Sequence, residues 1–442
     1  MDLFRRTYVT YYDVSGLGGA ETLHSRIVNY LAASKCKLYM IASERDYAYN
    51  QIPKELLGNI IRIPVDGKYL STKNNSLKEK KEIQELVKTY LSLNDTILLA
   101  YAPYFNNLQI TMMIFESFQH ARLFTSFLHP ESWPRAIFSW PSVYGKSIRP
   151  LRKNSLYYYQ RELLKKLDTG SANWFMNDVT KKYHEFYYDV ELPNSRVIPL
   201  PFDIPEIDPV VLNRSRKNSD ILKVVWLGRF EYFKNPSIKK AYEALDRLTE
   251  KHKDLKVEFD LIGYGSEKYE KDIRKEVKTS GRLQVKYLGK IFPDRLPEVI
   301  AQYDVGVAMG TSALHIGVMG IPTIYVDASD ENHYKEIKGC WLHREPIGLG
   351  SGVYGDIAGF RIDGREDMRI LFEEMIAAPN LLEDYGVKDR NYVIENYDEN
   401  KIMPQIIDAW TSSTFSPGDM EVYRYPPLKR FIRRTARKIL RR

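Results

Sequence analysis

The feature that most constrains the fold is a pattern that occurs twice, in which short β-rich runs alternate with helical patterns. The first series comprises TYVTYY, KLYMIAS, DTILLAY, ARLFTSFL and SANWFMN. The second series comprises LKVVWLG, VEFDLIG, VKYLG, DVGVAMG and IPTIYV. Such alternation indicates βα units and parallel sheets, and its repetition predicts two α/β domains.

The length of the chain agrees with this division. At 442 residues it exceeds the roughly 250 to 300 residues at which a single core stops growing. The polar segment NRSRKNSD separates the two series, so we expect an N-terminal domain over 1–212, a linker at 213–220 and a second domain over 221–395. A helix and loop over 396–424 are expected to pack back toward the N-terminal domain, ahead of a tail at 425–442.

The composition is that of a folded protein, with 44% hydrophobic and 28% charged residues. Cys36 and Cys340 are the only cysteines, too few for a disulfide framework or a metal site, and they indicate a reducing compartment. The opening MDLFRRTYVT lacks a signal region, and no run approaches the roughly 18 apolar residues that span a bilayer. We therefore expect a cytoplasmic protein that is not integral to a membrane.

Glycines end several strands of the second series. They are Gly228, Gly263 with Gly265, Gly289 and Gly310. Ligands of open parallel sheets bind at the carboxyl ends of strands, where glycine allows close backbone approach and helix N-termini attract anions. The set favours a phosphate-bearing ligand over ordinary turn glycines.

The strongest local signal is VVWLGRFEYFKN. A buried strand delivers Arg229 to its end, and Lys234 follows just before a helix that Asn235 and Pro236 are suited to begin. Two such cations can neutralise a diphosphate, arginine as a bidentate fork and lysine as a point charge. The alternative is a solvated basic loop.

The segment AMGTSALHIGVMG places two hydroxyls where another helix should begin. Thr311 and Ser312 could face a bound anion at this helix N-terminus, or one of them could simply cap the helix. His315, one turn further on, could contact a ligand or be an ordinary helix histidine.

Several common nucleotide motifs are missing from the sequence. It contains no Gly-x-x-x-x-Gly-Lys-Ser/Thr loop, and Gly16, Gly18 and Gly19 do not fit the dinucleotide fingerprint. An Asp-x-Asp pair, which could hold a divalent metal against a diphosphate, is also missing. We therefore expect no metal and no cofactor, with the cations doing the work of a metal.

Taken in order, these segments resemble the GT-B glycosyltransferases, specifically the nucleotide-sugar-dependent family 4 type. The matching segments, covering about residues 8 to 410, are SGLGGAETLHSRIVNYL, FTSFLHPESW, SANWFMNDVTKKYHEFY, RVIPLPFD, VVWLGRFEYFKNP, DLIGYGSE, VKYLGKI and DVGVAMGTSALHIGVMGIPTIYV. The resemblance implies two Rossmann-like parallel-sheet domains facing a cleft. The first would hold the acceptor and the second the nucleotide sugar.

The resemblance also implies roles for the second domain's residues. Arg229 and Lys234, following Gly228, match the pair that binds the donor diphosphate and stabilises charge on the leaving nucleotide without a metal. Glu231 matches a sugar or ribose contact. The remaining matches are Gly263 and Gly265 on the nucleotide side, and Lys290 and Ile291 near the base.

Two matches fall in the first domain. His129, in LHP, resembles the histidine that approaches the donor sugar across the cleft, although it could instead be a structural histidine before a proline-fixed turn. Gly18 and Gly19 then belong to a loop that closes over donor phosphates or acceptor, the alternative being a tight turn.

The sequence departs from the family at one helix. Family 4 members usually carry two glutamates with seven residues between them, and aligning Gly320-Ile321-Pro322 places His315 at the second. A neutral histidine cannot supply the two acceptor oxygens of a carboxylate, so recognition of ribose or sugar must differ. The retaining stereochemistry implied by the resemblance depends on this site.

The C-terminal tail carries the net charge of the protein. Its segment LKRFIRRTARKILRR places apolar residues at helical spacing among cations, and the whole net charge of +8 resides in residues 425–442. Such a helix could lie on an anionic membrane, with Arg430, Phe431, Arg434 and Lys438 among the contacts. A nucleic-acid tail would not need the apolar stripe; a solubilising or protein-docking tail is the other alternative.

The resemblance, together with these observations, implies a hexosyltransferase, retaining and metal-independent, that moves a sugar from a nucleotide diphosphate sugar to a glycan acceptor. We expect the acceptor to be lipid-linked, the enzyme to be peripheral on the inner face of the cell membrane, and the pathway to be polysaccharide or glycolipid assembly. No nucleic-acid partner is expected. The alternatives are a non-hydrolysing sugar-nucleotide epimerase and a catalytically silent scaffold subunit.

Overall fold

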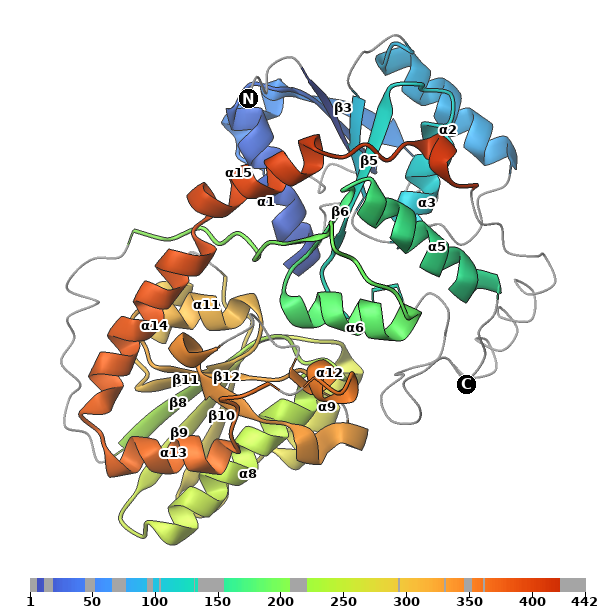
Figure 1. The fold of residues 1–442 in the computed structure, drawn as a ribbon. Coiled ribbons are helices and arrows are strands. Elements are labelled where there is room, and N and C mark those ends of the chain that lie inside the picture. The colour runs from blue at the N-terminus through green and yellow to red at the C-terminus, as the bar shows by residue number, and fades with distance from the viewer. Residues whose placement is uncertain are drawn as a thin grey trace.

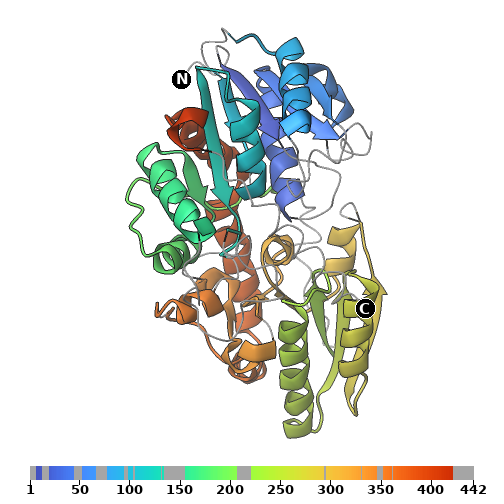
Figure 2. The same cartoon turned by 90° about the vertical axis from the view of Figure 1, so that its right-hand side faces the viewer.

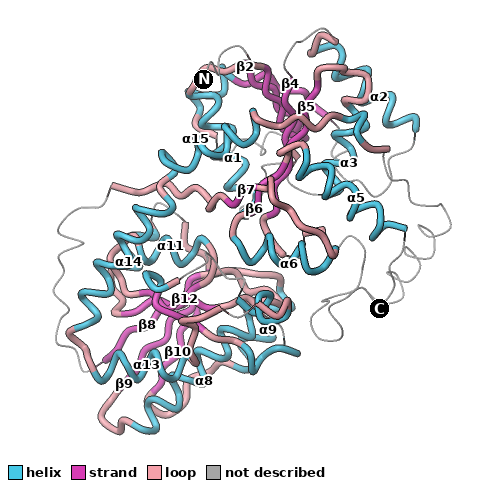
Figure 3. The backbone as a smooth tube through the Cα atoms, in the orientation of Figure 1, coloured by secondary structure: helices cyan, strands magenta, loops and turns pink. Residues whose placement is uncertain are grey.

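The computed structural model describes residues 6–11, 19–43, 52–65, 77–93, 98–102, 105–130, 132–133, 155–206, 221–292, 295–329, 331–345, 352–360 and 362–421. The predicted linker at 213–220 and tail at 425–442 lie outside these ranges. Figures 1 and 2 show two α/β bodies stacked along the long axis of the molecule, and Figure 3 shows that each has its own sheet. No helix within the described ranges is long and apolar enough to cross a membrane.

The N-terminal domain is built on a seven-stranded sheet in the order β3-β2-β1-β4-β5-β6-β7, with every neighbouring pair parallel. Its strands are β1 (Thr7–Tyr11), β2 (Lys37–Ser43), β3 (Ile60–Val65), β4 (Leu98–Tyr101), β5 (Ala121–Phe127), β6 (Asn173–Phe175) and β7 (Arg196–Val197). The helices that cover it are α1 (Gly19–Ala33), α2 (Leu77–Tyr90), α3 (Phe105–Ile114), α5 (Ser155–Thr169), α6 (Asp178–Tyr188) and α15 (Glu399–Thr411).

Both faces of this sheet are buried. In β1, Tyr8 joins a core with α1 and α15, whereas Val9 and Tyr11 join the opposite core with α2, α3, α5 and α6. Successive strand residues point to opposite faces, so a run that is apolar at every position indicates helices on both sides. Trp410 of α15 packs edge to face on Tyr8, with ring centroids 5.1 Å apart.

The second domain has a six-stranded sheet in the order β10-β9-β8-β11-β12-β13. Its strands are β8 (Ile221–Leu227), β9 (Lys256–Ile262), β10 (Leu283–Gly289), β11 (Val305–Ala308), β12 (Thr323–Val326) and β13 (Gly339–Trp341). Its helices are α8 (Asn235–Lys251), α9 (Glu267–Glu276), α10 (Leu296–Ile300), α11 (Thr311–Gly317), α12 (Gly352–Ile357), α13 (Met368–Ala377) and α14 (Leu381–Tyr397).

The predicted class, two parallel-sheet α/β domains, is confirmed, with one exception at an edge. Strand β13 pairs antiparallel with β12. The sequence prediction missed it, as it missed β3 and β7. Strands β7 and β13 have only two and three residues, too few to display a period, and β3 contains a proline, which argues against a strand. Each of the ten predicted runs overlaps a strand of the structure.

The described chain passes between the domains beside Phe202. The Phe202 N–H donates to the Tyr397 carbonyl at 2.7 Å, and the Glu399 N–H donates to the Phe202 carbonyl at 2.9 Å. The segment leaving the first domain is thus paired with the point where α14 gives way to α15. Figure 1 shows these two helices running in succession from the second domain to the first.

Candidate functional site

The second sheet has its topological switch point between β8 and β11. These strands are parallel neighbours, yet the chain continues outward from β8 through β9 and β10 and from β11 through β12. At such a point the two following loops diverge and leave a crevice at the carboxyl ends of the strands. The loops that flank it begin at Gly228 and at Met309.

The loop after β8 carries the predicted cations. Arg229 Nη1 lies 3.4 Å from Glu231 Oε1, and Lys234 is the residue immediately before α8. Burial, and next the Arg229 cation, lower the pKa of the Lys234 ammonium to about 8. Among the described side chains, no carboxylate lies within ion-pair distance of Lys234. The loop therefore presents a half-buried positive charge that forms no ion pair with a carboxylate of the described residues, although Glu231 lies near enough to act on it electrostatically.

Two glycines are explained by the packing of this loop. A Cβ on Gly263 would lie 1.9 Å from the Gly228 carbonyl oxygen, and one on Gly265 would lie 2.2 Å from the Phe230 carbonyl oxygen. The loops after β8 and β9 thus touch backbone to backbone.

The loop after β11 leads into α11 through Gly310. This residue has φ 61° and ψ −147°, a region that only glycine occupies readily, and it is the N-cap of the helix. Thr311 and Ser312 are the first helical residues, so neither caps the helix. Both are half-buried, and their hydroxyls make no hydrogen bond to the described residues.

His315 lies against the segment that joins the domains. Its ring meets Phe202 edge to face, with centroids 4.8 Å apart. Burial, and next the Arg26 cation of α1, lower the pKa of His315 to about 4. The imidazole is therefore neutral at physiological pH, and packing accounts for its position.

The ends of β9 and β10 carry aromatic side chains around a lysine. Lys290 Nζ lies 5.2 Å from the Tyr264 ring centroid and 4.7 Å from that of Phe292, which is 58% exposed. Ile291, between Lys290 and Phe292 in sequence, is half-buried against the apolar cluster that includes the buried side chains of α11. The predicted base-side residues thus stand next to two unanticipated aromatic rings.

His129 lies just beyond β5, on the first domain. Its ring centroid is 6.2 Å from that of Phe233 and 5.4 Å from that of Tyr354, both on the second domain. Phe233 precedes Lys234, so the structure brings His129 next to the cationic loop. Sequence reasoning missed Tyr354, which lies in a segment with no motif, whereas Phe233 stands inside the segment singled out for its charges.

Two groups of predicted site residues are not brought together with the cationic loop, α11 and His129. Gly19 is the first residue of α1, with nothing within 4 Å of the position of a Cβ, and Gly18 lies outside the described residues. The membrane residues Arg430, Phe431, Arg434 and Lys438 also lie outside them. Within the described ranges, no cluster of three His, Cys, Asp or Glu side chains could hold a metal ion.

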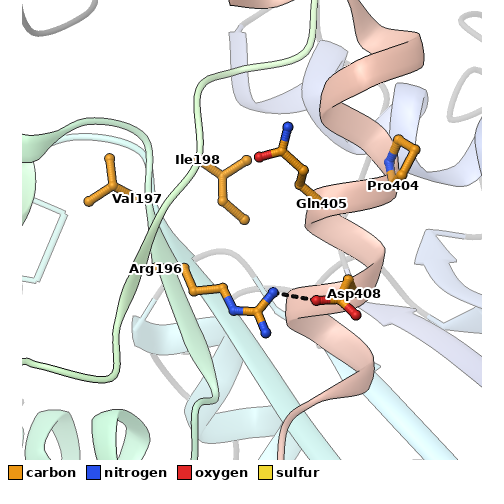
Figure 4. A pocket seen from close by; sticks show the side chains of 6 residues that line it. All are labelled: Arg196, Val197, Ile198, Pro404, Gln405 and Asp408. Carbon is orange, nitrogen blue, oxygen red and sulfur yellow. Dashed lines mark hydrogen bonds and ion pairs between the residues drawn. The ribbon is translucent and has the colours of Figure 1, made fainter.

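A pocket of about 540 Å³ lies elsewhere, between β7 and α15 (Figure 4). Its lining residues are Arg196, Val197, Ile198, Pro404, Gln405 and Asp408. The Arg196 guanidinium is already paired with Asp408, 2.5 Å from Oδ2. None of the predicted residues lines it, and its one cation is neutralised, so it does not have the chemistry of a phosphate site.

Comparison with solved structures places this geometry among known folds. A glycosyltransferase from Rickettsia africae matches with a TM-score of 0.61 at 14% identity, over 92% of this chain and 97% of its own. Anabaena HepE in complex with UDP matches with a TM-score of 0.59 at 12% identity, over 92% and 99%. An Escherichia coli trehalose-6-phosphate synthase bound with UDP-2-fluoro glucose gives 0.57 at 12%, over 92% and 99%. No protein-family model and no curated protein sequence matches. The chain has the GT-B fold.

At these identities the likeness establishes the fold alone. In this GT-B chain, the cationic loop and α11 belong to the second domain, and His129 reaches them from the first. The family 4 assignment remains a resemblance of motifs.

Proposed function

We propose that this protein is a glycosyltransferase that moves a sugar from a nucleotide diphosphate sugar to a glycan acceptor. The observation that carries the proposal is Lys234, a half-buried cation without a carboxylate partner among the described residues, beside Arg229 at the switch point of the second sheet. A buried cation is costly unless it is paired. A diphosphate bound there would supply the missing counterion.

The proposed roles follow from position. Arg229 and Lys234 bind the diphosphate and stabilise the charge that develops as the nucleotide leaves, which is electrostatic catalysis by groups already in place. The free hydroxyls of Thr311 and Ser312 are available to donate hydrogen bonds in the same crevice. His129 approaches the sugar from the first domain.

UDP is the first donor nucleotide to test, because two proteins of the same fold are bound to UDP or to a UDP-sugar analogue. We further propose retaining transfer to a lipid-linked acceptor in polysaccharide or glycolipid assembly. The support for a lipid acceptor is the basic amphipathic sequence at 425–442, which suits a helix on an anionic inner leaflet.

Titration calorimetry of the full chain with UDP, GDP and dTDP tests the donor site. Arg229→Ala and Lys234→Ala should each weaken binding of the preferred nucleotide about 10- to 100-fold, as expected for loss of a charge-assisted contact. Lys240→Ala is the matched control, because Lys240 lies on α8 over the Tyr334 ring and away from the crevice. Unchanged affinity in both variants would remove the donor-site assignment.

A sedimentation assay with phosphatidylserine vesicles tests the tail. The full chain should bind, less strongly as salt increases, and a chain truncated after Tyr425 should not. Equal binding by the truncated chain would end the proposal of membrane attachment.

Product analysis of a UDP-sugar incubated without any acceptor separates transfer from epimerisation, since only an epimerase would convert the sugar alone.

A further inference from the structure

A buried carboxylate at the carboxyl end of β12 joins separate segments of the second domain. Arg365 donates to Asp327 through Nη2 and to Asp356 Oδ2, 3.3 Å away, through Nη1. The Gly352 N–H donates to Asp327 Oδ1 at 3.1 Å. The Asp327 and Arg365 side chains are 4% and 2% exposed. One ion pair therefore fixes both the start of α12 and the chain beyond it.

The backbone of α12 packs closely on the ion pair. A Cβ on Gly352 would lie 2.2 Å from Arg365 Cζ and 2.3 Å from Asp327 Oδ1, so only glycine allows this approach. A change in either charged side chain would therefore alter the surface on which the start of α12 packs.

The same end of β12 holds the chain on both sides of Lys234. The Ser329 N–H donates to the Phe233 carbonyl at 3.0 Å, on the N-terminal side of the lysine. The Ser237 Oγ donates to the Asp327 carbonyl at 2.6 Å, on its C-terminal side. The backbone of Lys234 is consequently held between two bonds to the segment that carries Asp327.

Helix α12 reaches from this ion pair to the first domain. Its Tyr354, only 1% exposed, lies edge to face on His129 and on Tyr183 of α6, with centroids 5.4 and 5.3 Å apart. Just beyond the helix, the Phe360 ring lies 3.6 Å from Lys182 Nζ, also on α6. The ion pair therefore lies between the Lys234 loop and helix α12, whose Tyr354 contacts His129.

We propose that Asp327 and Arg365 are a positioning pair, which holds Lys234 and α12 in one arrangement and thereby sets the cation of the donor site against His129 of the first domain. The assignment of the donor site rests on the proposed function; the mechanical link does not. A buried ion pair contributes little net stability compared with apolar residues of the same size, so its use here lies in fixing geometry.

Hydrogen exchange of the ligand-free full chain tests the link without any nucleotide. Arg365→Lys keeps the charge but loses the fork that serves Asp327 and Asp356 together. Exchange should become at least about tenfold faster in 229–238 and in 352–360, and remain unchanged in β9 and β10. Arg344→Lys is the control, because Arg344 pairs with Glu374 at 3.0 Å in the same domain and touches neither segment. Unchanged exchange in Arg365→Lys, or equal acceleration across the whole domain, would overturn the proposal.

A second variant guards against failure to fold. Asp327→Asn with Arg365→Gln removes both charges and leaves no buried charge unpaired. This double variant should melt close to the wild type but keep the fast exchange of both segments and bind UDP at least about tenfold more weakly. Recovery of slow exchange and of UDP affinity would contradict a positioning role. If the wild type binds no nucleoside diphosphate, the proposed function fails, while the exchange measurements still decide whether the pair links the two segments.

Discussion

The His129 ring of the first domain lies edge to face with the Phe233 ring of the second, with centroids 6.2 Å apart. The contact joins residues 104 positions apart in sequence and puts His129 next to the residue that precedes Lys234. It marks the place where the two halves of the proposed active site meet.

His129 should affect transfer of the sugar more than binding of the nucleotide. Changing His129→Ala removes a group that approaches the donor sugar, so the rate of transfer should fall about 100-fold, in the range seen for groups that act on the reacting centre. The affinity for UDP should stay within about twofold. Steady-state rates and calorimetry on the same preparation measure both quantities.

His120→Gln is the control for this variant, because His120 is an exposed histidine of the same domain. Its transfer rate should equal that of the wild type. A loss of UDP affinity in His129→Ala as large as the loss of rate would assign the histidine to binding of the nucleotide.

The affinity for UDP should fall as pH rises through about 8. Burial and Arg229 lower the pKa of Lys234 to about 8, so an increasing fraction of the free protein is neutral above this pH and must take up a proton to bind a diphosphate. Calorimetry between about pH 7 and 9.5 should show the decline in the wild type. In Lys234→Arg, whose cation keeps its proton throughout, the decline should disappear. The same pH dependence in both proteins would exclude Lys234 as its source.

Alanine at Gly263 or Gly265 should destabilise the second domain. Each Cβ would meet a backbone carbonyl of the β8 loop, which cannot turn aside as a side chain could. A cost of about 1 to 3 kcal/mol is expected from such overpacking, measured as the change in the unfolding transition in urea. Gly58→Ala, where nothing lies within 4 Å of the added atom, should be close to neutral. If alanine at Gly263 and Gly265 were as close to neutral as alanine at Gly58, the two loops could separate without a loss of stability.

His315 should make the folded state sensitive to acid. Its pKa is about 4 when folded and near 6.5 when unfolded, so the unfolded chain binds more protons between these values and stability is lost as pH falls through this window. The loss attributable to this residue is on the order of 1 to 3 kcal/mol. Unfolding of His315→Gln and wild type at pH 7 and pH 5 measures it. The variant should lose less stability on acidification; an identical loss would mean that the ring is hydrated.

Much of the fold was readable because each strand carries its own signal. Runs such as KLYMIAS and DVGVAMG are apolar at nearly every position, the pattern of strands covered on both faces, and the structure places β2 and β11 there. The strand ends then located Arg229 and Lys234. Strands β7 and β13 were missed because two or three residues display no period, and β3 because its run contains a proline.

The contacts that define the candidate site were less accessible. The segment SGVYGDI contains no motif that predicts the contact of Tyr354 with His129. Asp327 follows a strand as many acidic residues do, and its sequence context does not predict its ion pair with Arg365, 38 positions later. The sequence also left open whether Thr311 and Ser312 cap a helix; in the structure Gly310 takes that place. Such pairings depend on how far-apart segments fold onto one another, which local patterns do not encode.

The sequence by itself determined the alternation of strands and helices, the division into two α/β domains and the positions of the cations at strand ends, because these depend on periodicity and on residues close together along the chain. Only the tertiary structure decided which of these residues meet. Lys234 acquires its lowered pKa from burial and from Arg229. The Phe233 ring beside it meets His129 of the first domain only because segments far apart in sequence fold onto one another. Burial and long-range contact are properties of the packed molecule, set by the sum of many weak interactions and not by any one segment.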